Sequence, residues 1–233
     1  MSAWRAALVL ALALAFGVSP VWVPDFGGFD PDSFPIPQRD PPVQPAGYAF
    51  AIWGLIYLWL IAGAAFGLWK RGTDPHWEPM RLPLALSLAV GAIWLPVAVL
   101  SPVWATVLIW AMLIPALLAL FRVPGTDPWL AAWPVGLYAG WLSAASCVAI
   151  GLLLGGYGFL SEDAAAVAMI IVAAVLAYVV QSRLNGVPAY GIAAIWALVA
   201  IVVQNGLLTT PGLLAAAGAA VLILPTLQSV RAT

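Results

Sequence analysis

The stretch that decides the fold is residues 45–70, PAGYAFAIWGLIYLWLIAGAAFGLWK, which carries no charge before its last residue. A helix of about 20 apolar residues crosses a bilayer, so this stretch predicts a transmembrane helix. Phe50, Trp53 and Tyr57 are spaced three and four residues apart and therefore share one face of that helix. Such a face either packs on a neighbouring helix and on the bilayer interface, or forms the wall of a site for a flat, largely apolar ligand.

The composition of the whole chain extends this prediction. Of its 233 residues, 64% are hydrophobic and 7% are charged, whereas soluble proteins carry roughly 25% charged residues. The uncharged stretches leave room for eight spans: one each in residues 6–24, 41–69, 128–161 and 164–182, and two each in 82–121 and 184–230. The expected fold class is therefore all-α, a polytopic transmembrane bundle of about eight helices. Residues 1–23 either stay as the first span or are removed as a signal peptide.

The basic residues predict how these spans are oriented. Cytoplasmic loops of membrane proteins carry an excess of Lys and Arg. With the N-terminus inside, only Arg39 falls outside, and the inner segments hold Arg5, Lys70, Arg71, Arg81, Arg122, Arg183 and Arg231. We therefore expect a multi-pass integral protein of a bacterial inner membrane with both termini in the cytoplasm.

Two loops differ in character. Residues 24–45, on the outside, contain seven prolines, which restrict the chain and remove hydrogen-bond donors. This loop is either a simple connector or a lid over the outer end of the bundle, and its length favours the lid. The inner loop, residues 71–80, reads as a solvated turn with Trp77 at the membrane interface.

Several classes of function lack the residues that they need. No Lys, Arg, Asp or Glu lies inside a predicted span, although ion-coupled transporters keep such residues there. The only histidine, His76, lies in a loop, so no Ser/His/Asp set and no metal site can be assembled. We expect no enzymatic activity and no required cofactor, although a porphyrin could be a ligand. The expected partners are the lipid bilayer and a hydrophobic small molecule but no nucleic acid, and pairing with a second copy of the chain stays open.

Three aromatic motifs on the second, third and fifth spans resemble those of one family. Pro45, Trp53 and Tyr57 match a helix that follows a proline-containing loop and carries Trp and Tyr four residues apart. Residues 91–94, GAIW, keep the Trp but not the Asn of an Asn-x-x-Trp pattern. Residues 137–145, LYAGWLSAA, keep the Tyr, Trp, Ser and Ala of the third pattern but not its Pro. The chain thus resembles the TspO/MBR family, the tryptophan-rich sensory proteins related to the mitochondrial translocator protein.

The resemblance implies a five-helix membrane core over residues 1–155, with residues 156–233 as three additional transmembrane helices. It also implies a pocket among the five helices for a tetrapyrrole such as protoporphyrin or for a sterol-like ligand, covered by the first loop. The function would be that of a sensor or carrier for this ligand. The expected ligand-binding residues are Tyr48, Phe50, Trp53, Tyr57, Trp94, Tyr138 and Trp141.

Two other functions stay open. Residues 45–55 and 188–198 share Pro-Ala followed by Ile-Trp-x-Leu at equal spacing. This repeated motif is what the inverted repeat of a small-solute transporter would show, and such a transporter would have its cavity between the second and seventh spans. Alternatively, the protein is a structural membrane subunit whose aromatic rings face outward.

The predicted topology can be tested by labelling. Single cysteines placed at Asp32 and at Asp74 should react with membrane-impermeant reagents from opposite sides of the membrane, because an odd number of spans separates the two loops. Labelling of both positions from the same side would contradict the topology.

Overall fold

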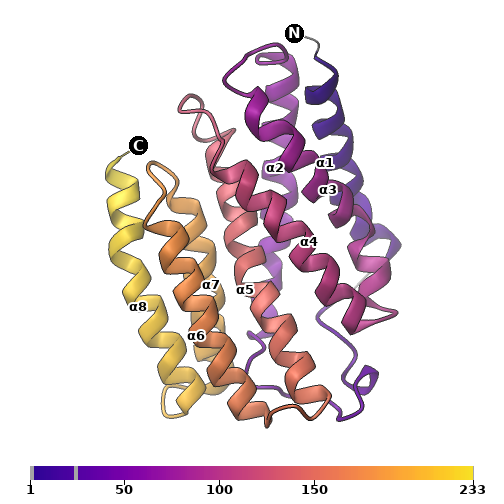
Figure 1. Ribbon diagram of the computed structural model, residues 1–233, viewed down its shortest axis with the longest axis vertical. Coiled ribbons are helices and arrows are strands. Elements are labelled where there is room, and N and C mark those ends of the chain that lie inside the picture. The colour runs from indigo at the N-terminus through magenta and orange to yellow at the C-terminus, as the bar shows by residue number, and fades with distance from the viewer. Residues whose placement is uncertain (1–2, 24–25, 233) are drawn as a thin grey trace.

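Eight long helices follow one another in the computed structural model, which describes residues 3–23 and 26–232 (Figure 1). All eight are long and apolar enough to cross a membrane, and the described residues form no strand. The predicted all-α transmembrane class is therefore confirmed. The long helices are α1 Trp4–Trp22, α2 Ile52–Trp69, α3 Glu78–Ala98, α4 Pro102–Leu120, α5 Ala132–Gly156, α6 Glu162–Gln181, α7 Pro188–Asn205 and α8 Thr210–Arg231, and two short 3₁₀ helices are η1 Pro31–Ser33 and η2 Gly47–Ala51.

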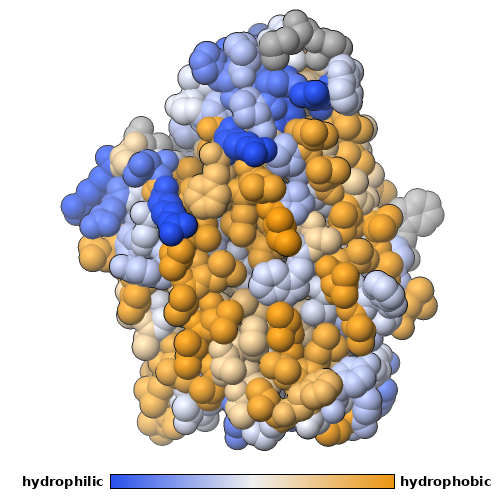
Figure 2. All heavy atoms as spheres, viewed as in Figure 1, coloured by the Kyte–Doolittle hydropathy of each residue, from blue (hydrophilic) through white to orange (hydrophobic). Residues whose placement is uncertain are grey.

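The two ends of the bundle differ. Both chain termini lie at one end (Figure 1), which we call the basic end because it carries seven of the eight basic residues, Arg5, Lys70, Arg71, Arg81, Arg122, Arg183 and Arg231. We call the opposite end, where residues 26–51 lie, the loop end. Between the two ends, the face in Figure 2 is a broad apolar band. This pattern fits a multi-pass membrane protein, while its orientation in the membrane stays a prediction.

The helix boundaries follow local signals in the sequence. The side chains of Ser101, Ser161 and Thr209 accept hydrogen bonds from backbone N–H groups in the first turns of α4, α6 and α8, as N-cap residues do. Proline occupies the first turn of α3, α4, α7 and α8, where its missing N–H costs nothing. Residues 99–101 therefore separate α3 from α4, and residues 206–209 separate α7 from α8, which are the two pairs of spans expected in residues 82–121 and 184–230.

Helix α5 is the centre of the bundle, with α2, α4, α6 and α7 packed around it. It is the most buried of the eight membrane spans. Its contact with α7 depends on Gly136 and Gly140. A Cβ atom at Gly136 would lie 2.6 Å from Cγ1 of Val187, and one at Gly140 would collide with the carbonyl oxygen of Tyr190. Small residues allow such close contact between membrane helices.

The last three helices are joined to the others through α5. Helix α6 packs on α5 and α8, and α7 packs on α5 and α8. Inside the α5–α7 contact, the hydroxyl groups of Tyr190 and Ser143 lie 2.9 Å apart, and Ser143 donates to the carbonyl of Ala139. The division of the chain near residue 155 into a core and an addition stays a prediction, and in space the two parts share this buried contact.

The proline-rich loop folds over the loop end of the bundle, as the lid alternative predicts for its described residues, 26–45. Phe34 is buried, and the side chain of Val43 lies against Gly151 of α5. The amide of Ile36 donates to the carbonyl of Gly156 at the end of α5 at 2.9 Å. The amide of Ala46 donates to a carbonyl of α7 at 3.1 Å. The loop is thus attached to both central helices.

The prediction for the inner loop, residues 71–80, is wrong for Trp77. Thr73, Pro75 and His76 are exposed, as expected for a solvated turn, but Trp77 is only 2% exposed and is buried in the protein. Its ring packs against Gly67 of α2 and beside Phe66. Because Gly67 has no side chain, the indole can lie directly on the helix. The loop is therefore folded into the basic end of the bundle.

Candidate functional site

A cavity of about 60 Å³ lies in the loop-end half of the bundle, between α3, α4, α5, α7 and the proline-rich loop. We call it the aromatic cavity. Phenylalanine and tryptophan form much of its wall, and small residues of α5 form another part. The residues that line it are Phe26, Gly28, Phe29, Gln44, Pro45, Phe50, Trp94, Ile109, Trp141, Ala144, Ala145, Val148, Ala149, Leu152 and Ala197.

Ring contacts close the cavity on the side of the loop. Phe26 meets Trp94 edge to face, with ring centroids 5.4 Å apart, and Phe29 lies 6.4 Å from the same ring. On the opposite side, Phe50 meets Trp141 edge to face at 6.0 Å. Such pairs contribute about 0.5–1.5 kcal/mol each beyond area burial. The closure of the cavity at Trp94 therefore depends on a few contacts of modest strength.

Short side chains explain why space is left among these rings. Ala144, Ala145 and Ala149 of α5 line the cavity, and Ala197 of α7 faces the same space. None of them reaches far enough to fill the gap between the helices. An alanine-rich surface beside bulky rings leaves an apolar space, which suits an apolar molecule.

Two polar groups stand out in the apolar wall. Trp141 is 2% exposed, yet its indole N–H has no hydrogen-bond partner among the described residues. By contrast, the indole N–H of Trp94 donates to the carbonyl of Ala105 at 2.9 Å. An unpaired buried donor costs about 1–3 kcal/mol. The amide side chain of Gln44 is the second polar group of the wall.

A wider cleft of about 360 Å³ lies beside the cavity, lined by residues of α1, α2 and α3 and by the loop. Trp53 and Tyr57 of α2 form one side, with their rings stacked at 5.4 Å. Phe26, Phe50 and Trp94 line both hollows. These three rings therefore form the partition between the cavity and the cleft.

The structure brings five of the seven predicted site residues to these hollows. Phe50, Trp94 and Trp141 line the aromatic cavity, and Trp53 and Tyr57 line the cleft. The expected approach of α2 to α5 is confirmed, since the rings of Trp53 and Trp141 lie 6.2 Å apart. Whether these residues bind a ligand stays a prediction.

The other two predicted residues, Tyr48 and Tyr138, line neither hollow. Tyr138 is fully buried, and its hydroxyl group lies 2.8 Å from that of Ser87 on α3. Tyr48 is 45% exposed and packs against Trp196 of α7. It lies in the 3₁₀ helix η2, where successive residues turn by about 120°, so Tyr48 and Phe50 point in different directions.

Sequence reasoning missed part of the wall. The aromatic residues Phe26 and Phe29 were the available signal, because a polar connector does not need them. Gln44 gave a second signal, because it is a polar residue next to the predicted membrane helix. Ala197 gave no signal, because alanine is common throughout the spans.

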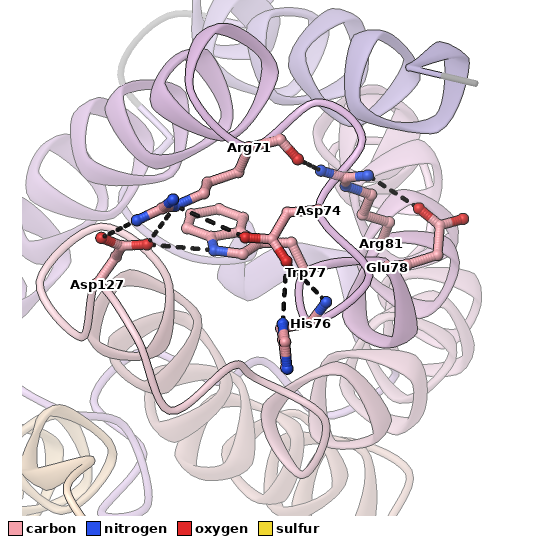
Figure 3. Close-up of polar contacts among 7 residues, drawn as sticks. All are labelled: Arg71, Asp74, His76, Trp77, Glu78, Arg81 and Asp127. Carbon is pink, nitrogen blue, oxygen red and sulfur yellow. Dashed lines mark hydrogen bonds and ion pairs between the residues drawn. The ribbon is translucent and has the colours of Figure 1, made fainter. Parts of the chain in front are cut away.

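A second group of polar residues lies at the basic end (Figure 3). Arg71 donates to both carboxylate oxygens of Asp127, at 2.8 and 3.2 Å, and the indole N–H of Trp77 donates to the same carboxylate. Arg81 is buried and donates to Glu78 and to the carbonyl of Gly72. These bonds join the loop before α3 to the loop before α5. The described residues contain no group of three or more His, Cys, Asp or Glu side chains that could hold a metal.

The hydrogen bond from Arg71 lowers the pKa of Asp127 below its ordinary value of 3.8. A carboxyl group with a lowered pKa in the folded state stabilises the fold above its ordinary pKa, and this stabilisation is lost as the pH falls through the lowered value. The contact therefore holds at neutral pH and weakens in strong acid.

Replacing Asp127 with Asn should lower the free energy of unfolding at pH 7 by about 1 kcal/mol and reduce the loss of stability below pH 4. Asn suits the site because Asp127 has a φ of 55°, which Asn also tolerates. Thermal unfolding in detergent at several pH values measures the effect. The control is Asp163→Asn, at an exposed position; equal losses in both variants would contradict a specific role of the Arg71 contact.

Fold and site together define a multi-pass membrane bundle with an aromatic cavity under a proline-rich loop. The family model described as TSPO-like protein matches residues 37–228, which is most of the chain. The chain therefore belongs to the TSPO-like protein family, as the aromatic motifs predicted. The match includes the three helices that follow α5. No curated protein and no solved structure matches the chain.

Proposed function

We propose that this protein binds a flat, hydrophobic ligand, such as a tetrapyrrole or a sterol, in the aromatic cavity and acts as a membrane sensor or carrier for it. The observation that carries this proposal is the apolar cavity, about 60 Å³ in this structure, between the rings of Phe50, Trp94 and Trp141 and the alanines of α5. Small-molecule sites are mostly apolar and usually measure about 300–1,000 Å³, so the ligand would displace the rings of the partition and occupy the cavity together with the adjoining cleft of about 360 Å³.

The polar groups of the cavity wall add to this support. A tetrapyrrole side-chain carboxylate or a sterol hydroxyl offers an oxygen that can accept a hydrogen bond. The indole N–H of Trp141 has no partner among the described residues, so such a ligand would satisfy it. The amide of Gln44 provides a second group that fixes orientation.

The same wall favours binding over catalysis. None of the described residues that line the aromatic cavity is a carboxylate, histidine, cysteine or lysine. General acid–base catalysis needs such a group within hydrogen-bond reach of the reacting atoms. We therefore propose a binding protein rather than an enzyme.

The alternative functions have less support. A transporter built on an inverted repeat would place its cavity between α2 and α7, but α7 contributes only Ala197 to the aromatic cavity and α2 contributes no residue to it. A structural subunit would turn its rings outward, but Trp94 is 8% exposed and Trp141 is 2% exposed. The inward rings are what a ligand site requires.

Replacing Trp141 with Ala should weaken protoporphyrin binding by roughly two orders of magnitude, because a stacking wall and a hydrogen-bond donor are lost and a few kcal/mol correspond to such a factor. Titration of purified protein with protoporphyrin, followed by quenching of tryptophan fluorescence, measures the affinity. Saturable quenching is expected for the unmodified chain.

The matched control is Trp104→Ala. Trp104 is 62% exposed at the start of α4 and does not line the cavity, so the affinity should stay unchanged. Absence of saturable quenching in the unmodified protein would refute tetrapyrrole binding. An equal loss in the two variants would place the binding outside the aromatic cavity.

A further inference from the structure

A separate groove of about 480 Å³ lies at the basic end, on the outer surface of α3 and α4. One end of the groove, which we call its head, is charged and carries Arg5, Glu78 and Arg122. Its walls are apolar and carry Leu82, Leu86 and Leu118. It shares no residue with the aromatic cavity, so its occupant does not depend on the proposed function.

The shape of the groove follows from the sequence. Helices α3 and α4 are adjacent and run in opposite directions, so the beginning of α3 lies beside the end of α4. Pro83 of α3 and Pro115 of α4 line the groove, and their short rings leave the space between the helices unfilled. From Glu78 to Leu86 the groove extends over about 12 Å of helix at 1.5 Å per residue.

The walls of the groove are open to the surroundings. Leu82 and Leu118 are each 45% exposed and Leu86 is 56% exposed. These leucines belong to membrane spans, so hydrocarbon is the medium that they face. The walls are therefore suited to an acyl chain.

The head of the groove has an excess of positive charge. Arg122 is exposed, and its side chain has no hydrogen bond or ion pair among the described residues. Glu78 is the one acidic residue in the lining, and both of its oxygens are occupied, one by Arg5 at 2.6 Å and the other by Arg81 at 2.9 Å. Figure 3 shows Arg81 beside Glu78. The guanidinium of Arg122 is therefore available to an anion.

We propose that this groove binds an anionic phospholipid. Its phosphate lies at Arg122 and Arg5, and one acyl chain lies along Leu82, Leu86 and Leu118. Charge complementarity selects the headgroup, and the apolar walls select a lipid over a free phosphate. The charge pattern of the chain puts this end at the cytoplasmic leaflet, where the anionic lipids create a negative surface potential.

The test compares phosphatidylglycerol with phosphatidylcholine of the same acyl chains, bound to the purified full chain in detergent and measured by native mass spectrometry. Phosphatidylglycerol should bind more tightly. Arg122→Gln should weaken its binding by about fivefold, as expected for one basic residue near a lipid headgroup, and should leave phosphatidylcholine unchanged. The matched control is Arg183→Gln, which removes an exposed basic residue at the same end outside the groove and should have no effect.

A second variant tests the walls. Leu82→Trp fills part of the groove at a position that faces hydrocarbon, so it should weaken both lipids without loss of the fold. Three results would overturn the proposal. The first is equal affinity for the two lipids in the unmodified chain. The second is an equal loss of phosphatidylglycerol affinity in Arg122→Gln and Arg183→Gln. The third is that glycerol phosphate, at the concentrations used for the lipids, displaces phosphatidylglycerol while Leu82→Trp has no effect.

Discussion

The close contact between α5 and α7 is the constraint on which the rest of the structure depends. At Gly140 the backbone of α7 lies where a side chain of α5 would otherwise stand, and at Gly136 the side chain of Val187, just before α7, lies there. Further along α5, the small residues continue with Ala144, Ala145 and Ala149, but there the two helices leave the aromatic cavity between them and α3. The glycines of α5 therefore allow α7 to pack closely on it, and the alanines further along α5 leave space for a ligand.

The loop that covers this space is held unevenly. Its last part is attached to α7 by three hydrogen bonds: the amide of Ala46 donates to a carbonyl, the indole of Trp196 donates to Ala49, and the amide side chain of Asn205 donates to Pro42. Residues 26–29 make no hydrogen bond with the described residues and touch Trp94 by ring contacts. Displacement of residues 26–29 would break ring contacts but no hydrogen bond among the described residues, so we expect a ligand to pass at this part of the loop.

The sequence predicted the helices better than the site. Charged residues are costly inside a bilayer, so their spacing set the number of spans and their approximate limits. The spacing of the aromatic residues on α2 correctly predicted which face of the helix is turned toward α5, where the rings of Trp53 and Trp141 lie 6.2 Å apart. Spacing alone does not set the depth or rotation of a helix, and for this reason Tyr138 was assigned to the site although it bonds to Ser87 in the core. Trp77 was assigned to the interface because its burial on Gly67 depends on two segments that meet only in the folded protein.

We propose the aromatic cavity as the ligand site, and the most direct test is a structure of the protein in lipid nanodiscs with protoporphyrin bound. We expect density for the porphyrin among Phe50, Trp94 and Trp141, with an acceptor oxygen near the indole N–H of Trp141. Density at another place in the bundle, such as between α2 and α7 at mid-membrane, or a cavity that stays empty at saturating porphyrin, would contradict it.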